Sequence, residues 1–185
     1  GVAYSARKLK IKATIFMPRT TPSIKIEEVK KMKSEVVLVG DNFDESLDSA
    51  LKFCKKHKLP FIHPFDDPEV ISGQGTIGKE IIEDFQEKID VIFVAVGGGG
   101  LISGLGAYIK SFNPKIKIVA VEAEDAAGLY KSLEIGKRIK LDKVGLFADG
   151  AAAKQIGLNN YQLIKEWLDD SITVSTDEIC AAVKD

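Results

Sequence analysis

The sequence predicts an α/β fold with parallel strands, and three observations lead to this class. Short β-rich runs alternate with longer helical patterns along the 185 residues, as in a series of βαβ units with right-handed crossovers. The run Val91–Val96 is apolar at every position, which predicts a strand buried on both faces of a parallel sheet. Four consecutive glycines, Gly97–Gly100, then lead from that strand directly into an apolar helix.

Six runs are expected to form strands. Each is short, rich in β-branched or aromatic residues and separated from the next run by a helical pattern. In chain order they are Ala13–Met17, Glu35–Val39, Pro60–His63, Val91–Val96, Ile116–Glu122 and Ile172–Val174.

Helices are expected between these strands. The first begins at Pro22 and Ser23 and runs to about Met32, with proline near the first helical position, where its missing N–H is not needed. Four further helices have apolar residues three or four positions apart on one face. They are Asp44–Lys58 with Leu47, Leu51 and Cys54; Asp67–Phe85 with Ile77, Ile81 and Phe85; Leu101–Phe112 with Leu101, Leu105 and Ile109; and Leu158–Leu168 with Tyr161, Ile164 and Leu168.

Both ends of the chain fall inside helical patterns. The residues after Gly1 are typical of the middle of a helix, and no initiator Met precedes them. Near the other end, Ser175 and Glu178 have the capping-box spacing that begins a helix, and the chain stops soon afterwards at Asp185. We therefore expect a fragment of a longer protein, truncated at both ends. The Lys-Leu-Pro sequence at 58–60 is the expected passage from one lobe to another.

Composition excludes several classes of protein. The chain is 45% hydrophobic and 29% charged, with 26 basic and 27 acidic residues and a net charge of −1, so neither nucleic acid nor a membrane surface is an expected partner. The longest apolar run is too short to span a bilayer, and no signal peptide is visible. Cys54 and Cys180 have no metal-ligand or redox spacing. These features favour a cytoplasmic globular protein.

The glycine run predicts a phosphate site. Glycine backbone can approach a ligand closely, and the helix that follows directs free N–H groups and the positive end of its dipole at the loop. The run does not fit the dinucleotide fingerprint, because Ile102 and Ser103 occupy the places of the third glycine. It is not a P-loop either, since no Gly-Lys-Ser/Thr follows.

Two other interpretations of the glycine run stay open. One is a tight strand-to-helix turn with close packing, although such a turn needs one or two glycines rather than four. The other is a nucleotide-binding module, because Glu122 ends the following strand at about the place of a ribose-binding acid.

The two histidines and the neighbouring acids are expected to be structural. His57 lies at a helix end among lysines, and neither it nor His63 has further ligands at metal-binding spacing. Asp66 and Asp67 precede Pro68 and are predicted to be helix N-cap residues rather than a catalytic acid–base pair.

Several segments together resemble a known enzyme family. They are Gly1-Val-Ala-Tyr-Ser, Phe65-Asp-Asp-Pro with Gly73-Gln-Gly-Thr, Val96-Gly-Gly-Gly-Gly-Leu101, Val119-Ala-Val-Glu-Ala-Glu124, Val144-Gly-Leu-Phe-Ala-Asp-Gly150 and Asp177-Glu-Ile-Cys-Ala-Ala-Val-Lys-Asp185. In this order, and over essentially the whole chain, they resemble the threonine ammonia-lyases (threonine dehydratases) of biosynthetic type. The glycine run alone is shared with serine racemases and serine dehydratases.

The resemblance implies a fold and a reaction. The fold is that of the pyridoxal-phosphate enzymes related to tryptophan synthase β, with three-layer parallel sheets, helices on both faces and two lobes. Residues 1–59 would belong to the small lobe and residues 60–185 to the large cofactor-binding lobe. The reaction is the pyridoxal 5′-phosphate-dependent conversion of L-threonine to 2-oxobutanoate and ammonia in isoleucine biosynthesis. The intact enzyme would be a homo-oligomer, a tetramer.

The resemblance also assigns site residues. The phosphate-binding loop corresponds to Gly97, Gly98, Gly99, Gly100 and Leu101. Gly150 corresponds to a glycine that lines the cofactor region. The Schiff-base lysine of the family lies in a segment absent from this sequence, so no catalytic residue is expected here and the chain by itself should be inactive.

Metal binding and substrate choice are further points of comparison. In serine racemases a divalent cation binds an acid matching Glu122 and a second acid, but the second position here is Gly128, so no metal site is expected. A serine-directed dehydratase or racemase relative stays open, because substrate choice depends partly on residues outside this chain. Isoleucine regulation depends on a region that is not part of the sequence.

Overall fold

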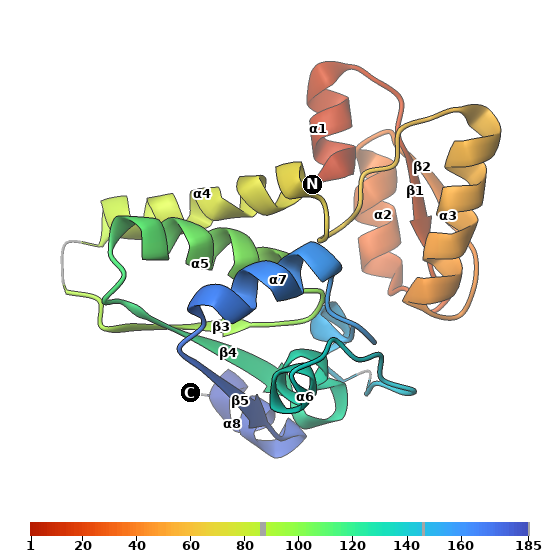
Figure 1. Ribbon diagram of the computed structural model, residues 1–185. Coiled ribbons are helices and arrows are strands. Elements are labelled where there is room, and N and C mark those ends of the chain that lie inside the picture. Colours follow the sequence, from red (N-terminus) through yellow and green to blue (C-terminus); the bar gives the residue numbers. More distant parts are fainter. Residues whose placement is uncertain (86–87, 146, 185) are drawn as a thin grey trace. The chain divides into compact units, whose positions relative to one another are not determined.

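The computed structural model describes residues 1–85, 88–145 and 147–184. These residues form two compact units, Gly1–Ile62 and His63–Asp185 (Figure 1). Both units contain parallel sheets with helices packed against them, so the α/β class predicted from the sequence is confirmed.

The first unit is built on a two-stranded parallel sheet. Its strands pair in register from Thr14 with Glu35 to Met17 with Leu38, and the ring of Phe53 lies 5.3 Å from that of Phe16 on the first strand. The elements are α1 (Val2–Leu9), β1 (Thr14–Met17), α2 (Ser23–Lys31), β2 (Glu35–Leu38) and α3 (Phe43–His57).

The second unit contains a three-stranded parallel sheet in the order β3-β4-β5. Its elements are α4 (Pro68–Asp84), β3 (Val91–Ala95), α5 (Gly100–Phe112), β4 (Lys117–Ala123), the short 3-10 helix η1 (Glu124–Ala126), α6 (Gly128–Ile135), η2 (Asp149–Ala151), α7 (Leu158–Trp167), β5 (Asp170–Val174) and α8 (Thr176–Lys184). Figure 1 shows α4, α5 and α7 gathered on one side of this sheet.

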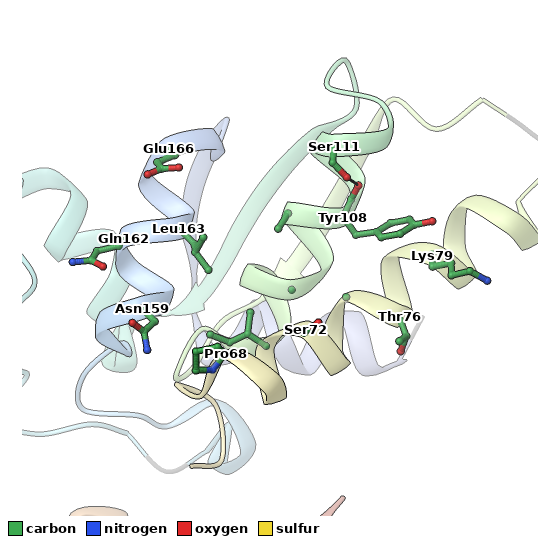
Figure 2. Close-up of a pocket in the computed structure, with 14 residues that line it drawn as sticks. Pro68, Ser72, Thr76, Lys79, Tyr108, Ser111, Asn159, Gln162, Leu163 and Glu166 are labelled. Atoms are coloured by element: carbon green, nitrogen blue, oxygen red, sulfur yellow. Dashed lines mark hydrogen bonds between the residues drawn. The ribbon is translucent and has the colours of Figure 1, made fainter. Parts of the chain in front are cut away.

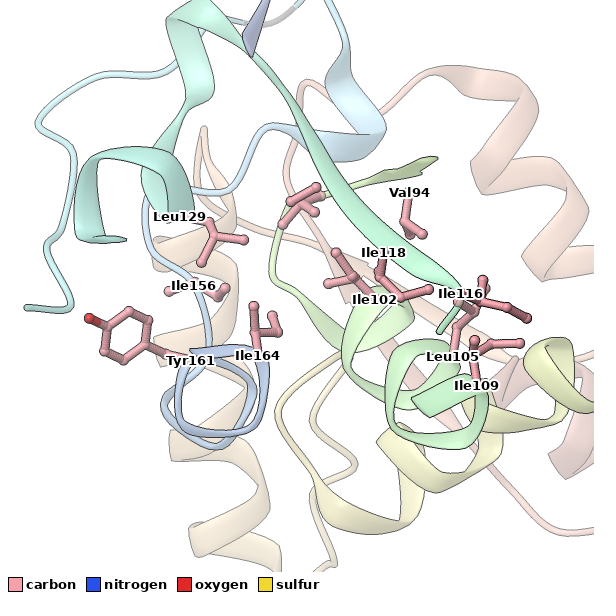
Figure 3. Packing of buried hydrophobic residues seen from close by; sticks show 12 residues of the cluster. Val94, Ile102, Leu105, Ile109, Ile116, Ile118, Leu129, Ile156, Tyr161 and Ile164 are labelled. Carbon is pink, nitrogen blue, oxygen red and sulfur yellow. The ribbon is translucent and has the colours of Figure 1, made fainter. Parts of the chain in front are cut away.

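The hydrophobic core of the second unit lies between the sheet and its helices. Ile102 and Ile109 of α5, Ile118 of β4, Leu129 of α6 and Ile164 of α7 are completely buried (Figure 3). Ile109 and Ile164, which occupy predicted apolar positions of α5 and α7, therefore face the core.

Most predicted elements are confirmed to within a few residues. The capping box is also confirmed, because the Ser175 N–H donates to Glu178 Oε2 at 2.7 Å and the Glu178 N–H donates to Ser175 Oγ at 3.3 Å. The described part of the chain contains no helix long and apolar enough to cross a membrane.

Two predictions are wrong. Pro60–His63 is not a strand, because Pro60 has no N–H to donate to a sheet and the His63 ring instead accepts hydrogen bonds from the turn that follows it. The strand β3 is not buried on both faces. It lies at the edge of the sheet, and Val91 and Phe93 on one face are 38% and 61% exposed, while Val94 on the other face is buried.

Candidate functional site: the glycine loop and its supports

The glycine loop connects β3 to α5. Helix α5 begins at Gly100, and Gly99 is its N-cap with φ +92° in the left-handed region, where only glycine is free of strain. Gly99 has no side chain with which to cap the helix. The backbone conformation at this position therefore explains why one of the four residues is glycine.

The loop presents a series of unused hydrogen-bond donors. Within the described residues no acceptor is recorded for the backbone N–H groups of residues 97–102, and the first N–H of the helix to be paired is that of Ser103, which donates to the Gly99 carbonyl at 3.0 Å. Unpaired N–H groups at the positive end of a helix bind anions, phosphate above all. A phosphate group therefore fits the donors that this loop offers.

Close packing explains the other three glycines. A Cβ at Gly97 would lie 2.8 Å from the carbonyl oxygen of Ala151, and one at Gly100 would lie 2.9 Å from that of Phe65. A Cβ at Gly98 would overlap the Phe65 ring. The packing part of the tight-turn interpretation is thus correct, but packing leaves the N–H groups of the loop without acceptors among the residues that the structure describes, and so does not replace a ligand.

A layer of side chains far away in the sequence supports the loop. Asp66 accepts hydrogen bonds from the N–H groups of Leu158 (2.9 Å) and Asn160 (3.2 Å) at the start of α7. The Asn160 amide donates to the carbonyl of Gly98 at 2.9 Å and to that of Phe65 at 2.7 Å. Three segments, at 65–66, 98 and 157–160, are therefore joined around one glycine.

Asp67 is a helix N-cap as the sequence predicted, whereas Asp66 is not the N-cap of the helix that follows it. Asp67 caps α4 by accepting from the N–H groups of Glu69 (2.8 Å) and Val70 (3.3 Å). Asp66 caps α7 instead, across more than 90 residues of sequence. Sequence reasoning missed Asn160, because a single polar residue in the first turn of a helix gives no signal of a distant partner.

His63 has the structural role predicted for it. Its Nδ1 accepts hydrogen bonds from the N–H groups of Asp66 (2.9 Å) and Phe65 (3.3 Å), which requires the neutral ring with Nδ1 unprotonated. Burial lowers the pKa of His63 below 6.5, against the opposing charges of Asp66 and Asp67. The neutral ring thus holds the turn that carries Phe65 against the glycine loop.

Glu122 is a buried helix-terminus residue. It is 1% exposed, and its two carboxylate oxygens accept from the N–H groups of Leu129 (2.9 Å) and Tyr130 (2.6 Å) in the first turn of α6. Burial raises the pKa of Glu122 above its ordinary value, while these backbone hydrogen bonds oppose the rise. Its oxygens are occupied by the chain itself, which argues against the ribose-binding role of the nucleotide-module interpretation.

The remaining expected site residues are Leu101 and Gly150. Leu101 is the second residue of α5, so its N–H belongs to the unpaired series. Gly150 lies in η2, and the residue after it, Ala151, is the one that packs on Gly97. No group of three or more potential metal ligands occurs among residues 1–85, 88–145 and 147–184.

A separate groove lies on the outer face of the helices. It has a volume of about 700 Å³ and runs between α4, α5 and α7 (Figure 2). Its lining includes Thr76, Lys79, Tyr108, Gln162 and Glu166, but no residue of the glycine loop. The groove is therefore distinct from the expected phosphate site.

Known proteins resemble this chain over its whole length. The family model described as pyridoxal-phosphate dependent enzyme matches residues 1–185. The biosynthetic L-threonine dehydratase IlvA of Burkholderia multivorans is 47% identical over 188 residues, covering 100% of this chain and 37% of that protein. The mitochondrial threonine dehydratase of Schizosaccharomyces pombe is 50% identical over 186 residues, covering 100% of this chain and 31% of the relative.

Solved structures agree with this relationship. The processed form of threonine deaminase isoform 2 from Solanum lycopersicum superimposes with a TM-score of 0.92 at 44% identity, covering 99% of this chain and 53% of the tomato protein. The chain thus spans about a third of the length of the curated relatives named above. Because the family model extends over every residue, this chain belongs to the family of pyridoxal-phosphate-dependent enzymes.

Proposed function

We propose that this chain is the central part of a threonine ammonia-lyase, which converts L-threonine to 2-oxobutanoate and ammonia. Proteins named threonine dehydratase are 47% and 50% identical to it over its full length. The observation that carries the proposal is the series of N–H groups from residue 97 to residue 102 that have no acceptor among the described residues. Such donors would form the anion site that a phosphorylated cofactor requires.

The residues proposed to hold the cofactor phosphate are Gly97–Gly100 and Leu101. Their N–H groups are fixed by the sheet before them and by α5 after them, so binding needs little rearrangement. Bound pyridoxal phosphate would supply an electron sink for the carbanion formed at the substrate α-carbon. The chain's own contribution is to anchor and orient the cofactor and to add the positive end of α5 at the phosphate.

Other parts of the proposal concern the protein outside this chain. The Schiff-base lysine would come from a preceding segment, so the chain alone would be inactive. The units Gly1–Ile62 and His63–Asp185 would belong to the small and large lobes, close to the expected boundary at residue 59. We further propose a cytoplasmic homotetramer that serves isoleucine biosynthesis.

The function is tested with the full-length protein that carries this chain. Purified protein should release 2-oxobutanoate and ammonia from L-threonine, lose this activity when pyridoxal phosphate is removed, and regain it when the cofactor returns. L-Serine, tested in parallel, measures the preference between the two substrates. Failure to form 2-oxobutanoate with the cofactor bound would contradict the proposal.

The loop assignment is tested by a matched pair of variants. Gly99 and Gly136 both have positive φ, of +92° and +71°, so Ala costs on the order of 1–3 kcal/mol of backbone strain at either site. At Gly99 the added Cβ also comes within 3.0 Å of Asn160 and Ile156. Only Gly99 lies in the loop. Gly99→Ala should lower the affinity for pyridoxal phosphate by at least about tenfold, whereas Gly136→Ala should leave it unchanged. Equal affinities in the two variants would contradict the assignment.

A further inference from the structure

We infer that Asn160 is a positioning residue that aims the Gly99 N–H at the phosphate site. This goes beyond the proposed function and rests on it. Asn160 is completely buried in the first turn of α7. Its side-chain amide donates to two backbone carbonyls, those of Gly98 at 2.9 Å and Phe65 at 2.7 Å.

The geometry of one peptide bond connects Asn160 to the ligand site. The Gly98 carbonyl accepts a second hydrogen bond, from the Gly157 N–H at 3.0 Å, so both donors hold it on the α7 side. In a planar trans peptide the following N–H points in the opposite direction from the carbonyl. Holding the Gly98 carbonyl therefore directs the Gly99 N–H away from α7, and this N–H is one of the donors without a recorded acceptor among the described residues.

The chemistry of the side chain fixes its orientation. Two carbonyl oxygens surround the amide nitrogen of Asn160, and only an NH₂ group can donate to both. Its Oδ1 is buried with no partner within the described structure, which costs free energy. The unpaired Oδ1 indicates that the NH₂ group is the part of the Asn160 side chain that the structure uses, through its hydrogen bonds to the Phe65 and Gly98 carbonyls.

The position of Asn160 does not depend on those two hydrogen bonds. Its backbone N–H is held by Asp66 at 3.2 Å, and the neighbouring Leu158 N–H is held by the same carboxylate at 2.9 Å. Asn160→Asp keeps the shape of the side chain but places carboxylate oxygen against two carbonyls. The glycine loop would then lose the hydrogen bond from the Asn160 amide, while the start of α7 would keep its hydrogen bonds to Asp66.

The chain offers a matched control next to this residue. Asn159 lies in the same turn of α7, and its amide donates to the Asp66 carbonyl at 3.1 Å without reaching the loop. Asn159→Asp makes the same chemical change at a neighbouring position. Asn160→Ser, which keeps one donor and buries no charge, is the second variant in case Asn160→Asp does not fold.

The test compares affinities for pyridoxal phosphate and for pyridoxal, which lacks the phosphate, in the full-length protein. The wild type and Asn159→Asp should strongly prefer the phosphorylated ligand. In Asn160→Asp or Asn160→Ser the affinity for pyridoxal phosphate should fall about tenfold or more, while the affinity for pyridoxal stays the same. A purely structural role would weaken both ligands together.

Two other outcomes overturn different statements. If the wild type does not prefer pyridoxal phosphate to pyridoxal, the glycine loop is not the phosphate site and the proposed function loses its main support. If the wild type has the preference and both Asn160 variants keep it in full, the loop assignment stands and the positioning role of Asn160 is wrong.

Discussion

The contact between α4 and α5 gives the sharpest test of the packing that supports the site. At Gly104 in α5, an added Cβ would overlap the carbonyl oxygen of Ile71 and lie 2.7 Å from the N of Gly75, both in α4. These are backbone atoms, which cannot rotate away as a side chain would. Gly104→Ala therefore requires α4 and α5 to separate by on the order of 1 Å.

The expected magnitude follows from two opposing effects. Overpacking a close contact costs about 1–3 kcal/mol, and the rigid neighbours place Gly104→Ala near the upper end. The higher helix propensity of alanine stabilises α5 by about 1 kcal/mol. A net loss of about 2 kcal/mol in unfolding free energy is therefore expected. Gly73→Ala is the matched control in α4, because its Cβ would meet no atom of the described residues within 4 Å. It should raise the unfolding free energy by about 0.5–1 kcal/mol.

Thermal unfolding of the full-length apoprotein, followed by circular dichroism, measures both variants. The difference of about 3 kcal/mol between them corresponds to a gap in Tm of roughly 6–12 °C where a unit of about 150–250 residues unfolds cooperatively. Gly104→Ala should lie below the wild type and Gly73→Ala slightly above it. If both variants shift Tm by the same amount in the same direction, the close approach of the two helices at Gly104 is wrong.

Three further predictions concern buried or capping polar groups. Glu122→Gln should lower the unfolding free energy by about 1–3 kcal/mol, measured by urea denaturation, because the amide NH₂ faces a backbone N–H. Burial raises the pKa of Glu122, so the stability that this group contributes at acidic pH is lost as pH rises through its folded pKa. In Glu122→Gln the unfolding free energy should lack this decrease with pH. The same dependence of unfolding free energy on pH in wild type and variant would contradict this. Burial lowers the pKa of His63 below 6.5, so the stability that this residue contributes is present above pH 6.5 and is lost as pH falls through its folded pKa. The unfolding free energy of His63→Gln should not show this loss. Asp67→Ala should cost about 1 kcal/mol through loss of the α4 N-cap, and unchanged urea denaturation would exclude that role.

Local patterns in the sequence were sufficient to predict most helices and strands. The apolar positions Leu105 and Ile109 of α5 and Ile164 of α7 are buried as their spacing indicates. The helix α6 was not predicted, because it is short, begins at Gly128 and is followed directly by Gly136. Burial of β3 was overestimated at Phe93, since an apolar run does not show whether other elements cover both faces of the strand.

The supports of the glycine loop could not be predicted from the sequence. The hydrogen bonds of Asn160 to Gly98 and of Asp66 to Leu158 join residues 62 and 92 positions apart, and no local pattern records such partners. The close packing at Gly98 could not be predicted either. Gly98 does not have a positive φ, but a side chain at this position would overlap the Phe65 ring. Gly98→Val would therefore disturb the packing of the loop before any ligand is bound.

The central claim is that the N–H groups of residues 97–101 bind the phosphate of pyridoxal phosphate. A crystal structure of the full-length protein with the cofactor bound measures this directly. We predict phosphate oxygens at hydrogen-bonding distance, about 2.7–3.2 Å, from several of these N–H groups, including that of Gly99, at the N-terminus of α5. A cofactor whose phosphate is held elsewhere, with the N–H groups of the glycine loop facing only water, would contradict the claim.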